Sequence, residues 1–103
     1  MATNMDFIEY IMECVVDFDA RYRKMFGEYM VYISDKPILL VCDNTVFVKI
    51  LPCIEELMQD ADKGVPYTGA KEHYILDMDD SELVQKVITE LEKVIPIPKK
   101  KKS

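Results

Sequence analysis

The sequence is poor in the residues that build nucleotide loops and nucleophilic active sites. It has three glycines, one histidine and no tryptophan among 103 residues. Gly27, Gly64 and Gly69 stand too far apart to form a glycine-rich phosphate loop. A cysteine or serine nucleophile needs a nearby base, and His73 is the single imidazole available. We therefore expect no catalytic residues and no enzymatic activity.

Long apolar runs are also missing. No stretch approaches the roughly 20 residues that a membrane-spanning helix needs. Residues 1–6 lack the basic start of a secretion signal. Cys14, Cys42 and Cys53 are odd in number and widely spaced, which argues against a disulfide framework, and we expect them to pack as small apolar groups. These absences predict a cytoplasmic protein without membrane contact.

Metal-binding patterns are absent as well. Zinc sites use closely spaced cysteine and histidine pairs, and the sequence shows none. Asp77, Asp79 and Asp80 form an acidic cluster, but it lacks the twelve-residue loop of a calcium-binding EF-hand. Acidic residues at this place favour the capping of a following helix. We expect no metal and no cofactor.

Positive charge is scarce outside the end of the chain. The formal net charge is −6; setting aside Lys99–Lys102 leaves 9 basic against 19 acidic residues, a net charge of −10. Such a body repels phosphate, so direct nucleic-acid binding is disfavoured. Residues 96–103 are expected to be a basic disordered tail. An alternative is a nucleic-acid accessory that uses this tail and Arg21, Arg23 and Lys24, although basic residues also protect an edge strand.

Apolar residues recur at helical spacing in three segments. This pattern predicts helices over residues 3–18, 52–59 and 80–94. Thr3 is the expected N-cap of the first helix. Pro96 ends the last one, because proline disfavours a helical conformation in the residue before it.

Alternating apolar residues predict an antiparallel meander between the first two helices. Gly27 is expected to act as a structural hinge that breaks the first strand. Asp43 and Asn44 both tolerate positive φ, which suits a two-residue hairpin turn. The expected order α-β-β-β-α-β-α predicts a two-layer α+β fold in one domain over residues 1–95. The first predicted strand runs over 22–25, breaks at Gly27 and continues over 28–33. The other strands are predicted over 37–42 and 46–50, with an edge strand over 71–76.

Two of these strands are apolar on both faces. In the segment 28–33, Tyr29 and Val31 face one side, whereas Met30 and Tyr32 face the other. An antiparallel sheet with one solvated face should alternate apolar with polar residues. Either three helices cover both faces or a second copy of the chain covers one of them, and we advance a homodimer as a hypothesis.

A second candidate site lies in a loop. The segment 66–74 gathers Tyr67, Lys71 and His73 around Gly69. Such groups can converge on an anion or a peptide, so the alternative function is a small-ligand-binding domain or a weak enzyme. The competing interpretation is a structured connector whose tyrosines pack on the core.

A family resemblance emerges from the centre of the chain. The chain resembles the N-terminal domain of the TfoX (Sxy) competence regulators over roughly residues 5–95. That family shows an arginine-rich lead, Met-Phe-Gly, an aromatic strand, a turn with aspartate, an apolar strand and an aromatic-x-Lys strand. The matching residues are Arg23, Met25, Phe26, Gly27, Tyr32, Asp35, Phe47 and Lys49.

The resemblance implies a bacterial α+β domain that acts through other regulators in the control of natural competence. We therefore expect a stand-alone, non-enzymatic protein-interaction module, an accessory to transcriptional regulation. Its expected partner is a protein such as a DNA-binding regulator. The candidate interaction residues are Arg23, Lys24, Phe26 and Lys49.

Overall fold

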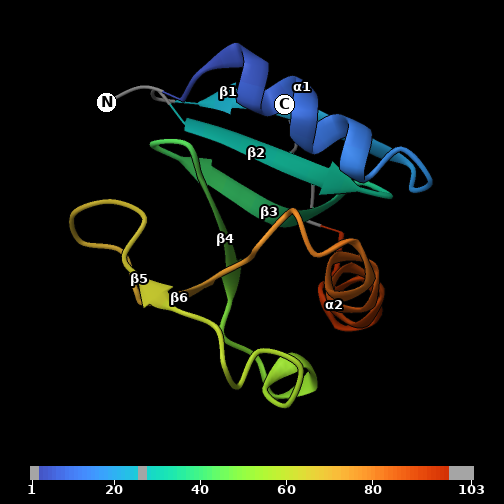
Figure 1. Ribbon diagram of the computed structural model, residues 1–103, viewed down its shortest axis with the longest axis vertical. Helices are drawn as coiled ribbons and strands as arrows, with labels where there is room; N and C mark the ends of the chain where they lie inside the picture. Colours follow the sequence, from blue (N-terminus) through green and yellow to red (C-terminus); the bar gives the residue numbers. More distant parts are fainter. Residues whose placement is uncertain (1–2, 26–27, 98–103) are drawn as a thin grey trace, which may run out of the picture.

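The chain folds as one six-stranded antiparallel sheet with helices packed on one face. The computed structural model describes residues 3–25 and 28–97. The strand order is β1-β2-β3-β4-β6-β5 (Figure 1). The expected α+β class, with helices near both ends of the chain, is confirmed. The elements are α1 (Met5–Cys14), β1 (Ala20–Met25), β2 (Glu28–Ile33), β3 (Lys36–Cys42), β4 (Thr45–Lys49), η1 (Pro52–Ile54), β5 (Lys63–Gly64), β6 (His73–Ile75) and α2 (Ser81–Val94).

Two tight turns set the register of the meander. Ser34 and Asp35 have φ values of 51° and 68°, and Asp43 and Asn44 have values of 50° and 57°. Two consecutive residues with positive φ are typical of type I′ hairpin turns, whose twist matches that of the strands. The turn predicted at Asp43–Asn44 is confirmed.

The meander has four strands where the sequence predicted three. The segments 20–25 and 28–33 do not form one broken strand; they pair with each other as a hairpin, with Tyr22 opposite Val31. The chain thus reverses direction where the prediction kept it running on. Phe26 and the predicted hinge Gly27 lie outside the described residues.

The helix predicted over 52–59 is wrong. Residues 52–54 form a short 3₁₀ helix, η1, and the chain continues through turns in which the Met58 amide donates to the Ile54 carbonyl at 2.9 Å. The Ile54 amide donates to the Leu51 carbonyl at 3.2 Å, and the Glu55 amide donates to the Pro52 carbonyl at 3.3 Å. These bonds span three residues instead of four, which winds the backbone more tightly than an α-helix and rarely continues far.

The strand predicted over 71–76 is shorter and is not an edge strand. β6 lies between β4 and β5, with Phe47 opposite Ile75 and Lys63 opposite Tyr74. The two-residue β5, which the sequence did not predict, forms the edge. Its pairing with β6 across a long loop left no local signal.

The first helix is shorter than the predicted 3–18, and its N-cap is not Thr3. Asn4 caps α1, because its side chain accepts a hydrogen bond from the Asp6 amide at 2.7 Å. The apolar pattern continues past the end of the helix, but Val16 is 74% exposed. The last helix begins and ends as predicted, with Asp80 as its N-cap and its final residue before Ile95 and Pro96.

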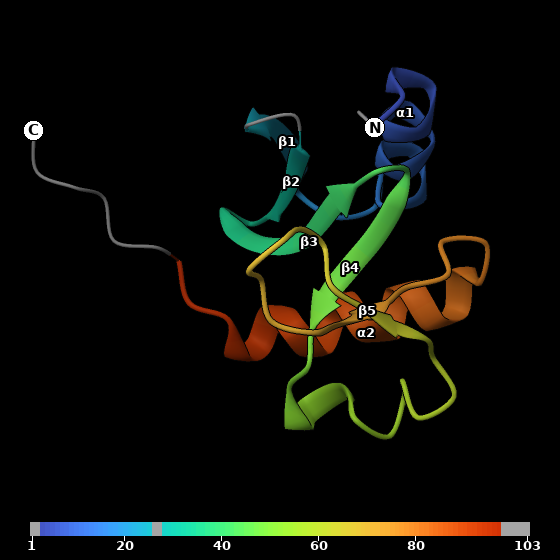
Figure 2. The same cartoon turned by 90° about the vertical axis from the view of Figure 1, so that its left-hand side faces the viewer.

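Both helices pack on the same face of the sheet. One continuous core joins buried residues of α1 and α2 to one side of the strands. Figure 2 shows the strands β3 and β4 in front of α2, which runs behind them. Among the residues that the structure describes, no helix is long and apolar enough to cross a membrane. Representative core residues are Ile8, Ile11, Val31, Leu39, Val41, Val46, Val87 and Ile88.

Candidate interaction surface

The face of the sheet opposite the helices carries a transverse row of side chains. Cross-strand pairing places Arg23 opposite Met30, Met30 opposite Leu40, Leu40 opposite Phe47 and Phe47 opposite Ile75. Because directly paired residues point to the same face, these five residues form one line across five strands. We call them the open-face row.

Apart from Arg23 at its end, the row is apolar, but it does not belong to the core. Met30, Leu40 and Ile75 are half-buried, whereas their strand neighbours Val31 and Leu39 are fully buried under the helices. Within the described part of the chain, both α-helices join the core on the other side. An apolar strip that is left partly exposed on a sheet is a feature of interaction surfaces.

Phe47 is the most buried member of the row. It is 7% exposed, and the ring of His73 meets it edge-on at a centroid distance of 6.4 Å. A Cβ atom at Gly64 would come within 3.4 Å of both Phe47 and Ile75, so the glycine allows β5 to approach closely. The loop 65–72 projects on the side of the sheet away from α2 (Figure 1).

Positive charge surrounds the row. Arg21 and Arg23 project from β1, and Lys49 follows Phe47 by two positions on β4 and pairs with His73. Glu28 is the acidic residue that register places on this face, while Asp35 forms an ion pair with Arg21 from the adjoining turn. The open face therefore carries an excess of positive charge on a chain whose formal net charge is −6.

The structure separates the residues that the resemblance grouped together. Arg23 is the β1 member of the open-face row, and Lys49 lies on the same face, two positions after Phe47 on β4. Lys24 pairs with Tyr29, whose side chain belongs to the core, so Lys24 projects from the opposite face at the sheet edge. The remaining candidate, Phe26, is outside the described residues.

In the candidate ligand loop, the side chain of His73 contacts the main chain of Lys71. His73 Nδ1 lies 2.8 Å from the Lys71 carbonyl oxygen, so the ring nitrogen donates to the main chain and not to a ligand group. Tyr67 is 50% exposed on the loop, and the His73 ring also contacts Phe47. The ligand-binding alternative stays a prediction without further support from the contacts.

The predicted acidic cluster acts locally. Asp80 accepts a hydrogen bond from the Leu83 amide at 3.2 Å, and Asp77 accepts one from the Asp79 amide at 3.0 Å. Asp79 also accepts a hydrogen bond from the Tyr10 hydroxyl, which ties the loop before α2 to α1 and raises the pKa of Tyr10. Helix capping by this cluster is confirmed for Asp80.

Several hollows lie beside the helices and the loops that lead to them. One, of about 620 Å³, is lined by four aspartates and four apolar residues, namely Asp60, Asp62, Asp77, Asp80, Leu57, Ala61, Ile75 and Leu83. In residues 3–25 and 28–97, no group of three or more histidine, cysteine or acidic side chains could hold a metal ion.

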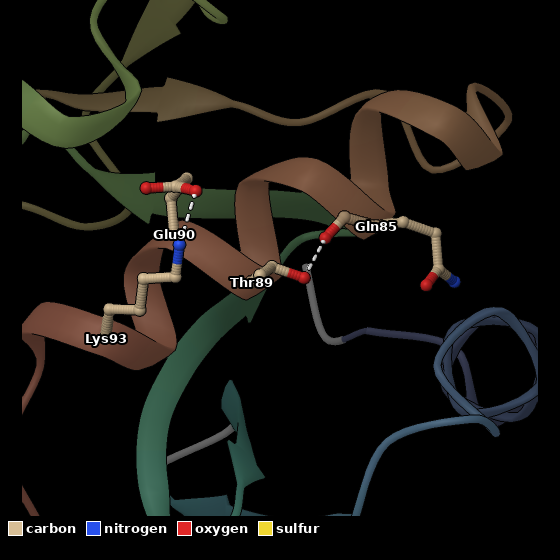
Figure 3. A network of polar contacts seen from close by, with 4 residues as sticks. All are labelled: Gln85, Thr89, Glu90 and Lys93. Carbon is tan, nitrogen blue, oxygen red and sulfur yellow. Dashed lines mark hydrogen bonds and ion pairs between the residues drawn. The ribbon is translucent and has the colours of Figure 1, made fainter.

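A second hollow, of about 390 Å³, lies between Cys53 and α2. Figure 3 shows two hydrogen bonds within that helix beside the hollow. The Thr89 hydroxyl donates to the Gln85 main-chain carbonyl at 2.7 Å, and Lys93 donates to Glu90 at 3.1 Å. Two polar side chains that line the hollow, those of Thr89 and Glu90, therefore bond within the helix.

Cys42 is an unreactive thiol on the open face. It is 4% exposed, and burial, followed by the negative charge of Glu28, raises the pKa of its thiol to about 12. The thiolate is the reactive form of cysteine. Because the pKa of Cys42 is raised, little thiolate exists near neutral pH. We expect iodoacetamide at pH 8 to modify Cys42 at least tenfold more slowly in the folded chain than in denaturant. Site-resolved mass spectrometry measures both rates; equal rates would contradict the burial of this thiol.

Sequence reasoning missed the row itself. Alternation placed Met30 on the face opposite Val31, and Leu40 on the face opposite Leu39. It could not show that Met30 and Leu40 pair with each other, because strand register is not encoded within a single strand. Ile75 joins the row only because β6 pairs with β4. A signal was present in the doubly apolar strands, which indicated an uncovered face without locating it.

Comparisons with known proteins leave the family open. No family model matches the chain. No solved structure matches it either. A curated relative is the "Uncharacterized 12.7 kDa protein in trpE 5'region" of Spirochaeta aurantia, 26% identical over 106 residues that cover 100% of this chain and 92% of the relative. The chain is therefore similar, over its whole length, to a small protein described as uncharacterized.

Proposed function

We propose that this chain is a non-enzymatic protein-interaction module and that the open face of its sheet is the binding surface. The observation that carries the proposal is the open-face row, a strip of partly exposed apolar side chains bounded by basic ones. Burying apolar surface is the dominant favourable contribution in most protein association. The positive rim adds orientation and specificity.

The proposed biological role is accessory to transcriptional regulation. It rests on the resemblance to the N-terminal domain of the TfoX regulators, through residues such as Arg23, Phe47 and Lys49. Arg23 and Phe47 are members of the open-face row, and Lys49 lies on the same face, two positions after Phe47 on β4. A regulator that such a module contacts would dock on this side of the sheet.

Affinity capture with matched variants tests the proposal. The full chain, Leu40→Glu and Val16→Glu would each be immobilised and exposed to a lysate of the source cells. Leu40 belongs to the open-face row, whereas Val16 is 74% exposed at the end of α1 on the helical side. Both variants exchange an apolar side chain for the same charge.

We expect the wild-type chain and Val16→Glu to retain the same protein and Leu40→Glu to lose it. The retained protein, once purified, should form a complex with the wild-type chain at a fixed stoichiometry. Identical retention by all three chains would remove the open face as the binding surface. Thermal unfolding of each variant controls for loss of the fold.

A further inference from the structure

The charges of the open face are opposite in sign to those of the whole molecule. Among the described residues, register places Arg21, Arg23, Lys49 and Glu28 on this face. Asp35 of the adjoining turn pairs with Arg21, so Arg23 and Lys49 remain against Glu28 and the face keeps a net positive charge. The chain as a whole has 19 acidic and 13 basic residues. An acidic molecule that concentrates positive charge around its apolar strip is complementary to a partner with acidic flanks.

The same charges argue against a second copy as the occupant. Stacking two open faces would bring Arg23 and Lys49 of both copies into one interface, with Glu28 of each copy to compensate, because Asp35 already pairs with Arg21 in each copy. Like charges that meet across an interface are costly. The homodimer expected from the sequence stays a prediction, and its pairing through this face is electrostatically unfavourable.

A nucleic-acid strand also fits this face poorly. Sheet platforms for single strands use exposed aromatic rings on which bases stack. Here the row is mainly apolar and non-aromatic, through Met30, Leu40 and Ile75, and the ring of Phe47 is 7% exposed. The other aromatic ring that register places on this face, Tyr32 opposite Arg21, is half-buried. The acidic remainder of the chain further repels a phosphate backbone.

A helix matches the shape of the row. Neighbouring strands lie about 4.8 Å apart, so a line across five strands extends about 19 Å. An α-helix rises 1.5 Å per residue and covers that length with about 13 residues. Packing a helix on each face of a sheet is a common layer arrangement, and the other face of this sheet is already covered in that way.

We propose that the occupant of the open face is an amphipathic α-helix of a partner protein, with an apolar stripe on the row and acidic residues on its flanks. The acidic residues lie against Arg23 near one end of the row and Lys49 near the other. This inference rests on the proposed function and adds the chemistry and secondary structure of the partner segment.

Selection from a displayed library of random 14-residue peptides tests the partner class. Binders would be selected on the full chain and counter-selected on Leu40→Glu. We expect the enriched peptides to be acidic, with leucine-like residues at helical spacing. Enrichment of basic peptides, or of peptides with strict two-residue alternation, would overturn the helix proposal and leave the proposed function standing.

Titration calorimetry with the most enriched peptide then tests the charges. Arg23 and Lys24 are adjacent exposed residues of β1 that project from opposite faces. We expect Arg23→Glu to weaken binding about fivefold, as expected for an exposed ion pair, and Lys24→Glu to change it less than twofold. Both side chains are exposed, so this pair remains informative if Leu40→Glu fails to fold.

Three other results would overturn the proposal. A selection that yields no Leu40-dependent peptide would remove the peptide-helix occupant, and the lysate capture would then decide the proposed function separately. Tighter binding of oligothymidylate than of any peptide would assign the face to nucleic acid. A 24 kDa species in light scattering that Leu40→Glu converts to 12 kDa would assign it to a second copy.

Discussion

Leu39→Ala is expected to reduce the free energy of unfolding by about 3 kcal/mol, whereas Leu40→Ala should cost about 1 kcal/mol or less. The two leucines are consecutive residues of β3 and point to opposite faces. Leu39 is 0% exposed in the core beneath the helices, and truncating it leaves a cavity that surrounding side chains fill only in part. Leu40 is half-buried in the open-face row, where water can enter the space.

Urea unfolding followed by circular dichroism measures both values, under conditions where the transition is two-state. Each variant loses the same atoms from the same strand, so the difference reports which face is covered. Equal losses would mean that the open face is packed as tightly as the core. A Leu40→Ala effect that grows with protein concentration would indicate that a second copy covers this face.

Asn44→Val is expected to lower the free energy of unfolding by about 2 kcal/mol. Asn44 has φ of 57°, a left-handed conformation that costs a branched side chain about 1–2 kcal/mol. Its side-chain oxygen also accepts a hydrogen bond from the Asn4 amide at 2.8 Å. A typical hydrogen bond contributes about 0.5–1.5 kcal/mol, less at an exposed site. Valine tolerates the positive φ poorly and has no acceptor for the Asn4 amide, so both effects lower the stability.

Two further variants of Asn44 separate those contributions. Asn44→Gly tolerates positive φ but lacks the acceptor, and we expect a loss of about 1 kcal/mol or less. Asn44→Asp retains an acceptor oxygen, and we expect a change within about 0.5 kcal/mol. Chemical denaturation measures all three variants. A valine variant as stable as the glycine variant would show that the turn relaxes to another conformation.

Local sequence signals were enough for the elements that depend on local contacts. α2 was predicted with its bounds, because its apolar stripe, Asp80 at its start and Pro96 after its end all act within a few residues. The Asp43–Asn44 turn was predicted because few residues accept positive φ twice in succession. The α+β class follows from these elements together.

Elements that depend on distant contacts were predicted less well. The end of α1 was placed too late because Val16 continues the apolar pattern, although it is exposed. The segment after Pro52 has helical spacing but winds as a 3₁₀ turn. β6 was taken for an edge strand, because its pairing with both β4 and β5 depends on a long intervening loop that no local pattern encodes.

The candidate site shows the same division. The sequence indicated which residues alternate within each strand, and it identified Arg23 and Lys49 as candidates. It did not indicate which face the helices would cover, since both faces of β2 and β3 are apolar. Nor did it distinguish Arg23 from Lys24, which requires the pairing of β1 with β2.

The position of β6 has a consequence for synthesis of the chain. β4 gains its second neighbour only when residues 73–75 have been made, and its outer edge pairs with them through Phe47 and Ile75. At about 5–20 residues per second, the ribosome takes roughly 1–5 seconds to travel from Lys49 to His73. During that interval the nascent meander has an unpaired apolar strand at its border, so this is the stage of biogenesis at which a chaperone would be needed most.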